Sequence, residues 1–164
     1  MKVALIGATG FVGAAVLQEL VQRGHEVVAL VRDPAKLPAQ AGVQVVQADV
    51  MNASAVQQAV RGTQAVLSAY NAGWANPNIY DDFLRGSAAI VQGAKAAGVS
   101  RYLVVGGAGS LYVAPGVQLV DTPQFPAAIY PGASAARDML TQLQEEETLD
   151  WTLLSPAVGF HAGS

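Results

Sequence analysis

A glycine-rich turn near the N-terminus separates an apolar run from a segment with helical period. Gly7, Gly10 and Gly13 recur at every third position of this turn. The apolar run, residues 2–6, is typical of a buried strand, and the pattern over about residues 11–23 predicts a helix that Gly24 ends. Glycines at this spacing permit a sharp turn, close approach of the backbone to a pyrophosphate and tight packing of helix on strand. The turn therefore predicts dinucleotide binding; a tight turn without a ligand is the alternative.

The start of the predicted helix adds to this interpretation. Its first N–H groups and the positive end of its dipole would face the phosphates of a bound dinucleotide. We expect the turn to contact the cofactor through Gly7, Thr9, Gly10, Phe11, Val12 and Gly13.

Strands and helices alternate along the rest of the chain. Further strands are predicted at 26–31, 43–47, 64–69, 101–105 and 151–154. Helices are predicted at about 53–61 with Asn52 as N-cap, from Asn76 (N-cap) and Pro77 to about 97, and at about 132–147. Residues 106–126 are rich in Gly and Pro and show little periodicity. Right-handed crossovers between such elements imply an α/β fold: a doubly wound parallel Rossmann-type sheet, ordered 3-2-1-4-5-6, with helices on both faces.

Composition supports this fold and narrows the partners. The chain has 164 residues, enough for a single domain spanning 1–164, and its 52% hydrophobic and 13% charged residues suit strands buried on both faces. A net charge of -3 argues against nucleic acid or an anionic membrane as partner. There is no cysteine, and the two histidines are isolated, so we expect no metal site. Without a signal peptide or an apolar stretch long enough to span a membrane, we expect a cytoplasmic protein.

The end of the second strand bears on the choice of nicotinamide cofactor. An acidic residue there would bind the ribose 2′-hydroxyl, whereas an arginine would stabilise a 2′-phosphate. Arg32 comes first, Asp33 follows it, and Lys36 lies one helical turn further on. We therefore expect NADP(H) in preference to NAD(H). The alternative is that Arg32, Asp33 and Pro34 form only a solvated turn.

The ends of the third and fourth strands would line the same cleft, because ligands of such sheets bind at the carboxyl ends of the strands. Asp49, followed by Val50, is placed to meet the adenine amino group, although it could equally cap a helix. Ala69, Tyr70 and Asn71 would lie along the central ribose. Tyr70 and Trp74 offer flat apolar faces that could stack on a flavin or quinone, or could simply pack under the loop.

Two further segments complete the predicted cleft. Gly106 and Gly107 begin a glycine-rich loop in which Ser110 and Tyr112 could donate hydrogen bonds to a substrate carbonyl. A turn that needs positive φ is the competing explanation for these glycines. Pro156 and Ala157 follow the last strand and would lie beside the nicotinamide ring.

These motifs together resemble the atypical short-chain dehydrogenases/reductases. The resemblance rests on Gly7–Gly13, Asn71-Ala72-Gly73-Trp74, Gly106–Leu111 and Leu154-Ser155-Pro156-Ala157, and covers essentially the whole chain. Within that group the chain is similar to NAD(P)H-binding, NmrA-like proteins of the NAD-dependent epimerase/dehydratase-like and NADH-flavin reductase type. The resemblance implies a Rossmann fold and a nicotinamide cofactor, and specifies the activity only loosely.

The chain departs from that group in two ways. Active members use a Tyr-x-x-x-Lys pair, in which the lysine lowers the pKa of the tyrosine. Tyr130 lies in the corresponding region, but position 134 is serine, and no lysine stands four residues after any tyrosine. Relatives also continue beyond the Ser-Pro-Ala segment, so we expect a C-terminal substrate-capping part to be missing here.

Hydride transfer to a flavin, quinone or similar small acceptor needs little acid–base help and tolerates the missing lysine. We therefore expect an NAD(P)H-dependent oxidoreductase with a small-molecule acceptor, without nucleic acid or membrane partners, and with a homodimer as a candidate assembly. Ser110, Tyr112 and Tyr130 are the candidate catalytic residues. A non-catalytic NADP(H)-binding sensor and an epimerase/dehydratase-like protein are the alternatives.

Overall fold

A six-stranded parallel sheet forms the centre of the molecule in the computed structural model, which describes residues 1–158. The strands follow one another in the order β3-β2-β1-β4-β5-β8, which confirms the predicted order, since β8 is the sixth strand of this sheet along the chain. Their bounds are Lys2–Ile6 (β1), Glu26–Val31 (β2), Val43–Gln47 (β3), Ala65–Ser68 (β4), Arg101–Val105 (β5) and Asp150–Leu154 (β8).

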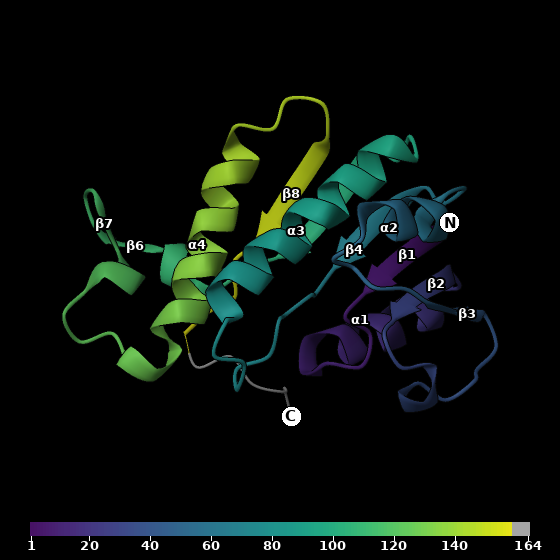
Figure 1. Cartoon of the computed structure of the whole chain (residues 1–164), viewed down its shortest axis with the longest axis horizontal. Coiled ribbons are helices and arrows are strands. Elements are labelled where there is room, and N and C mark those ends of the chain that lie inside the picture. Colours follow the sequence, from purple (N-terminus) through teal and green to yellow (C-terminus); the bar gives the residue numbers. More distant parts are fainter. Residues whose placement is uncertain (159–164) are drawn as a thin grey trace.

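In the described part of the chain, four α-helices cover this sheet: Phe11–Gln22 (α1), Ala53–Val60 (α2), Ile79–Ala96 (α3) and Tyr130–Gln144 (α4). The path from β1 to β3 runs toward one edge, whereas from β3 onward it runs toward the other. Because parallel crossovers are right-handed, this reversal places α1 on one face and the later helices on the opposite face. Figure 1 shows α3 lying between α2 and α4.

The core is correspondingly divided into two layers. On the α1 side, Leu5, Val27 and Ala29 of the sheet pack with Leu17. On the other side the larger layer joins the sheet to α2, α3 and α4 and includes Ala4, Ile6, Val28, Leu30, Val56, Val60, Val66, Phe83, Ile90, Tyr102, Met139 and Leu143. Since β1 and β2 are covered on both faces, their sequences are almost continuously apolar, as expected for central parallel strands.

The register brings the carboxyl ends of the strands to a common edge. Ile6 at the end of β1 pairs with Leu30 of β2 and with Ser68 of β4. Val104 of β5 pairs with Ser68 and with Leu153 of β8. The loops that carry the predicted site residues therefore leave the sheet at the same edge.

A helix begins where the sequence predicts it when a capping side chain binds N–H groups only two or three residues further on. Asn52 caps α2 as predicted, because its Oδ1 accepts hydrogen bonds from the N–H groups of Ser54 and Ala55. The helix α4 occupies 130–144 rather than 132–147, since Pro131 is tolerated within its first turn.

The predicted start of α3 is wrong. Its N-cap is Asn78, and the helix begins at Ile79, so Asn76 and Pro77 lie outside it. The Asn76 side chain instead holds the preceding loop: Oδ1 accepts from the Asn78 N–H at 2.9 Å, and Nδ2 donates to Asp82 Oδ2 at 2.9 Å. These hydrogen bonds, to residues two and six positions further along the chain, outweigh the Asn-Pro signal.

Residues 106–126 contain more structure than their composition suggests. A short helical turn, Ala108–Ser110 (η2), precedes an antiparallel hairpin of Tyr112–Ala114 (β6) and Val117–Gln118 (β7), and a second turn, Leu119–Asp121 (η3), follows. Pro115 and Gly116 connect the two strands, with Gly116 at φ +74°. Figure 1 shows this hairpin projecting beside α4. Within residues 1–158, no helix combines the length and apolar character that crossing a membrane requires.

Candidate functional site

Two glycines of the N-terminal turn are required by the fold itself. Gly7 has φ +85°, and a Cβ there would come within 2.5 Å of the Ala69 carbonyl oxygen. A Cβ on Gly13 would lie 1.7 Å from the Gly7 carbonyl oxygen. Gly7 thus lets β1 pass close to the end of β4, and Gly13 lets α1 pack directly against the turn.

Gly10 differs from both. Its φ of -81° and ψ of 172° suit any residue, and a Cβ would meet the Gly7 carbonyl oxygen at 3.4 Å, an ordinary contact. It is exposed at the N-terminus of α1, where glycine as the N-cap has no side chain to offer the first N–H groups of the helix. Residues 1–158 thus leave the space in front of Gly10 open, which fits a pyrophosphate held by the N-terminus of α1.

The remaining predicted residues of the turn lie around this opening. Thr9 and Phe11 are exposed, and Val12 is half-buried. The backbone of the turn is fixed by a hydrogen bond from the Gly10 N–H to the Gly7 carbonyl oxygen at 3.1 Å.

Arg32 lies just beyond the end of β2 with an exposed side chain. Its carbonyl oxygen accepts a hydrogen bond from Gln47 Nε2 at 3.3 Å, whereas its guanidinium forms no ion pair with an acid among residues 1–158. Asp33 turns its carboxylate back to the chain, where it accepts from the Ala35 N–H at 3.1 Å. A cation at the strand end is therefore available to a ligand, while the neighbouring acid is occupied.

Asp49 does not cap the helix that follows it, because Asn52 has that role. Its Oδ1 accepts a hydrogen bond from the Met51 N–H at 3.0 Å, and the residue is exposed. Val50 beside it is buried. The capping alternative for Asp49 is therefore wrong, and its contact with adenine stays a prediction.

The Tyr70 ring packs into the protein rather than standing free over the cleft. It stacks on Phe83 with ring centroids 5.9 Å apart, and its hydroxyl donates to the Asp82 carbonyl oxygen at 3.1 Å. Burial first, and then the charge of Asp82, raises the pKa of Tyr70, whereas the charge of Arg32 opposes this rise. Tyr70 therefore matches the packing alternative. The N–H groups of Ala69 and Tyr70 already donate to the Ile6 carbonyl oxygen and to Ser68 Oγ, and the contact of these residues with a ribose stays a prediction.

The adjoining loop presents other groups to solvent. Asn71 is exposed, and its Oδ1 accepts from the Gly73 N–H at 2.7 Å. Trp74 is 61% exposed, yet its ring passes so close to Gly132 that a Cβ there would lie 2.6 Å away. The indole therefore packs on the first turn of α4, and most of the residue remains exposed.

The glycines after β5 serve close packing and not a left-handed backbone. Positive φ does not occur at Gly106 or Gly107, so that competing explanation is wrong. A Cβ on Gly106 would approach the Leu153 side chain to 2.8 Å, and one on Gly107 would contact Ala136 at 3.5 Å. The Gly106 N–H donates to the Leu154 carbonyl oxygen at 2.9 Å, which joins this loop to the end of β8.

Ser110 is the candidate catalytic residue that the structure places at this joined edge. It is 7% exposed, its hydroxyl donates to the Gly107 carbonyl oxygen at 3.3 Å, and Ser155 Oγ lies 3.3 Å from Ser110 Oγ. The half-buried Pro156 and the exposed Ala157 follow Ser155 directly. Two hydroxyls from the ends of β5 and β8 thus lie together beside the predicted nicotinamide position.

The two candidate tyrosines lie elsewhere. Tyr112 is on β6 and is 69% exposed, and Tyr130 begins α4 with its ring edge-on to Phe125 at 6.4 Å. Among the described residues, no hydrogen bond joins either phenol to Ser110.

Sequence reasoning missed Gln118, whose Nε2 donates to the Ser110 carbonyl oxygen at 3.1 Å. No sequence signal points to it, because it lies in the non-periodic segment.

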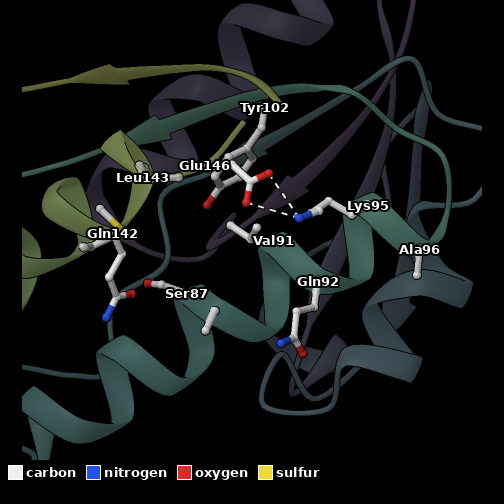
Figure 2. A pocket seen from close by; sticks show the side chains of 11 residues that line it. Ser87, Val91, Gln92, Lys95, Ala96, Tyr102, Gln142, Leu143 and Glu146 are labelled. Carbon is white, nitrogen blue, oxygen red and sulfur yellow. Dashed lines mark hydrogen bonds and ion pairs between the residues drawn. The ribbon is translucent and has the colours of Figure 1, made fainter. Parts of the chain in front are cut away.

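A separate cavity of about 590 Å³ lies between α3 and α4, where Tyr102 meets both helices (Figure 2). Lys95 and Glu146 close one end with an ion pair, Nζ lying 3.1 Å from Oε1. The hydroxyl and N–H of Thr148, and then Lys95, lower the pKa of Glu146 to about 2, although burial opposes them. Burial raises the pKa of Tyr102, and a hydrogen bond with Ser68 opposes that rise. The residues that line this cavity include none of the predicted cofactor residues.

The sequence profile of the NAD(P)H-binding family matches residues 7–159, from the glycine turn to just past the last strand. The chain belongs to this family. The match confirms the expected resemblance and a Rossmann-type NAD(P)-binding fold. In the described part of the chain, no group of three or more His, Asp or Glu side chains could hold a metal ion.

Three known proteins illustrate the likeness. An uncharacterized protein of Bacillus subtilis, YwnB, is 38% identical over 162 residues, which cover 98% of this chain and 73% of YwnB. A Bacteroides thetaiotaomicron structure described as an epimerase superimposes with TM-score 0.86 at 44% identity, covering 95% of this chain and 70% of that one. A Streptococcus pneumoniae structure described as an NADH-flavin reductase has TM-score 0.78 at 36% identity, covering 96% of this chain and 72% of that one.

Proposed function

We propose that this member of the NAD(P)H-binding family is an oxidoreductase that reduces a flavin, a quinone or a similar small acceptor. The observation that carries the proposal is the shared edge of the sheet: the open Gly10 turn and the Ser110–Ser155 hydroxyl pair both lie at the carboxyl ends of the strands. Such an edge is where Rossmann-type sheets hold their ligands. The likeness to a protein described as an NADH-flavin reductase supports the choice of acceptor.

The proposed reaction requires little acid–base catalysis from the side chains of the protein. The glycine turn and the start of α1 would hold the pyrophosphate, and the loops after β4, β5 and β8 would flank the acceptor. NAD(P)H would supply the hydride when bound, and water would supply the proton that completes reduction of the acceptor. The Ser110 hydroxyl, which donates to the Gly107 carbonyl oxygen in this structure, would rotate to donate a hydrogen bond to an acceptor carbonyl.

We further propose that NADP(H) is preferred to NAD(H). The Arg32 guanidinium has no acidic partner among residues 1–158, whereas Asp33 is held by the Ala35 N–H. An exposed arginine at this strand end would form a charge-assisted hydrogen bond with a 2′-phosphate.

Steady oxidation of NADPH in the presence of FMN or a small quinone tests the activity. We expect each acceptor to raise the rate well above that with oxygen alone, and Gly10→Leu to abolish the increase. Tight NADPH binding without turnover by any acceptor would contradict the proposal and favour a non-catalytic sensor. The partner and cytoplasmic location predicted from the sequence stay predictions.

A further inference from the structure

The backbone of Ser110 is held from outside its own loop. Gln118 Nε2 donates to the Ser110 carbonyl oxygen at 3.1 Å, across the base of the β6–β7 hairpin. The Leu119 N–H donates to the Leu111 carbonyl oxygen at 2.8 Å, next to this contact. The Ser110 hydroxyl, at the other side of the residue, lies 3.3 Å from Ser155 Oγ. The position of that hydroxyl therefore depends on what fixes the hairpin.

The hairpin is fixed by Arg137 of α4. Its Nη1 lies 2.9 and 3.0 Å from the two carboxylate oxygens of Asp121 in η3, and 3.5 Å from Gln118 Oε1. Its Nε donates to Asp138 Oδ1 at 2.6 Å. The Arg137 side chain is 20% exposed, so water screens these contacts less than at an open surface.

The network extends to a second helix. The Tyr80 hydroxyl of α3 donates to Asp138 Oδ2, the carboxylate oxygen that Arg137 Nε does not use. A continuous set of polar contacts thus joins α3 and α4, through Arg137 and Gln118, to the Ser110 carbonyl. Both helices pack on the sheet, so the hairpin is tied to the rigid part of the molecule.

We propose that Gln118 and Arg137 are positioning residues, which set the place of the Ser110 hydroxyl relative to an acceptor; this inference rests on the proposed function. Glutamine suits the intermediate position because its amide donates to the Ser110 carbonyl while its oxygen faces Arg137. A carboxylate there would keep the partner of Arg137 and lose the donor. The Ser110 backbone would then lose its hydrogen bond to the hairpin, and the hydroxyl on the same residue would lose the positioning that this bond gives.

Gln118→Glu isolates the donor, because the new charge faces Arg137 and stabilises the rest of the network. We expect kcat for NADPH oxidation with FMN or quinone to fall roughly ten- to a hundredfold, as for misplacement of a reacting group by about 1 Å. The dissociation constant for NADPH and the melting temperature should change little. A kcat within twofold of the native value would overturn the proposal.

Gln57→Glu is the matched control. Gln57 Nε2 donates to the Ala96 carbonyl oxygen at 3.3 Å, so this change also removes a glutamine-to-carbonyl hydrogen bond, but between α2 and the end of α3. We expect native kcat in this variant. A loss of kcat equal to that of Gln118→Glu would show a general effect on the fold and contradict positioning.

Hydrogen exchange separates this inference from the proposed function. We expect amides of residues 108–121 to exchange faster in Gln118→Glu and in Arg137→Leu than in Gln57→Glu, and Arg137→Lys to restore part of the protection. If native protein shows no turnover, the proposed function fails, and exchange alone then decides whether these side chains position Ser110. Unchanged exchange in both Gln118→Glu and Arg137→Leu would overturn the inference.

Discussion

Gly13 lies against the Gly7 carbonyl so closely that a Cβ would come within 1.7 Å of the oxygen, whereas a Cβ on Gly10 would stay 3.4 Å from the same atom. The three glycines of one motif therefore have different tasks. The fold requires Gly7 and Gly13, whereas the described part of the chain leaves space for a ligand in front of Gly10. Substitution of Gly10 therefore tests ligand binding, whereas substitution of Gly13 tests folding stability.

Gly10→Leu should abolish NADPH binding and leave a folded domain. The leucine side chain would occupy the space that the pyrophosphate needs, while the backbone of residue 10 already suits any amino acid. Loss of glycine at the N-cap should lower the free energy of unfolding by only about 1 kcal/mol. Calorimetric titration with NADPH measures the effect, and native affinity would contradict it.

Gly13→Ala provides the contrast. Relieving the clash with the Gly7 carbonyl requires α1 to move away from the turn, so we expect the free energy of unfolding to fall by about 3 kcal/mol or more. Urea denaturation measures this loss. A Gly13→Ala variant as stable as Gly10→Leu would show that α1 is not packed against the turn as described.

Arg32→Ala should weaken NADPH binding by about 1.5–3 kcal/mol and leave NADH binding almost unchanged, because only NADPH carries the 2′-phosphate. Lys36→Ala, one turn further along the chain, is the matched control, and it should change NADPH affinity less. Equal affinities of the native protein for both cofactors would count against the assignment of Arg32.

Tyr130→Phe should change the rate of NADPH oxidation by only a few-fold. Tyr130 has no lysine four residues after it, and its ring packs on Phe125 at the start of α4. Ser110→Ala should lower kcat roughly a hundredfold, as expected for a hydrogen-bond donor to the acceptor. A hundredfold drop for Tyr130→Phe with native NADPH affinity would show instead that the phenol is a general acid.

Acid should destabilise the protein through Glu146. The pKa of this carboxylate is lowered from 4.5 to about 2 in the folded state, so its stabilising contribution is complete above about pH 4.5 and is lost as the pH falls toward 2. Melting temperatures measured across this interval should fall less steeply in Glu146→Gln than in the exposed control Glu147→Gln.

Substitutions can rank the groups that lower the pKa of Glu146. Thr148 supplies the largest favourable contribution through its hydroxyl, and Lys95 supplies a smaller one. Thr148→Val should therefore reduce the acid sensitivity of the melting temperature more than Lys95→Met does. The reverse order would show that the ion pair in the cavity between α3 and α4 dominates.

The sequence by itself determined the local elements and their order in the sheet. Strand β1, the Gly7–Gly13 turn and the Asn52 cap follow from side chains acting within a few residues, and alternation with right-handed crossovers then leads to the order of the strands. The same reasoning brought the loops after each strand to one edge, which is where the candidate cofactor residues lie.

Only the tertiary structure decided how those residues are used. Asn76 binds Asp82 instead of capping α3, Tyr70 stacks on Phe83, and Ser110 meets Ser155 and Gln118; no sequence pattern indicates any of these contacts. Local signals such as an Asn-Pro pair or an aromatic residue in a loop are weak, so long-range packing and hydrogen bonds override them. Gly10 became distinct from its two neighbours only when β4 and α1 were in place, because steric space is a property of the assembled backbone.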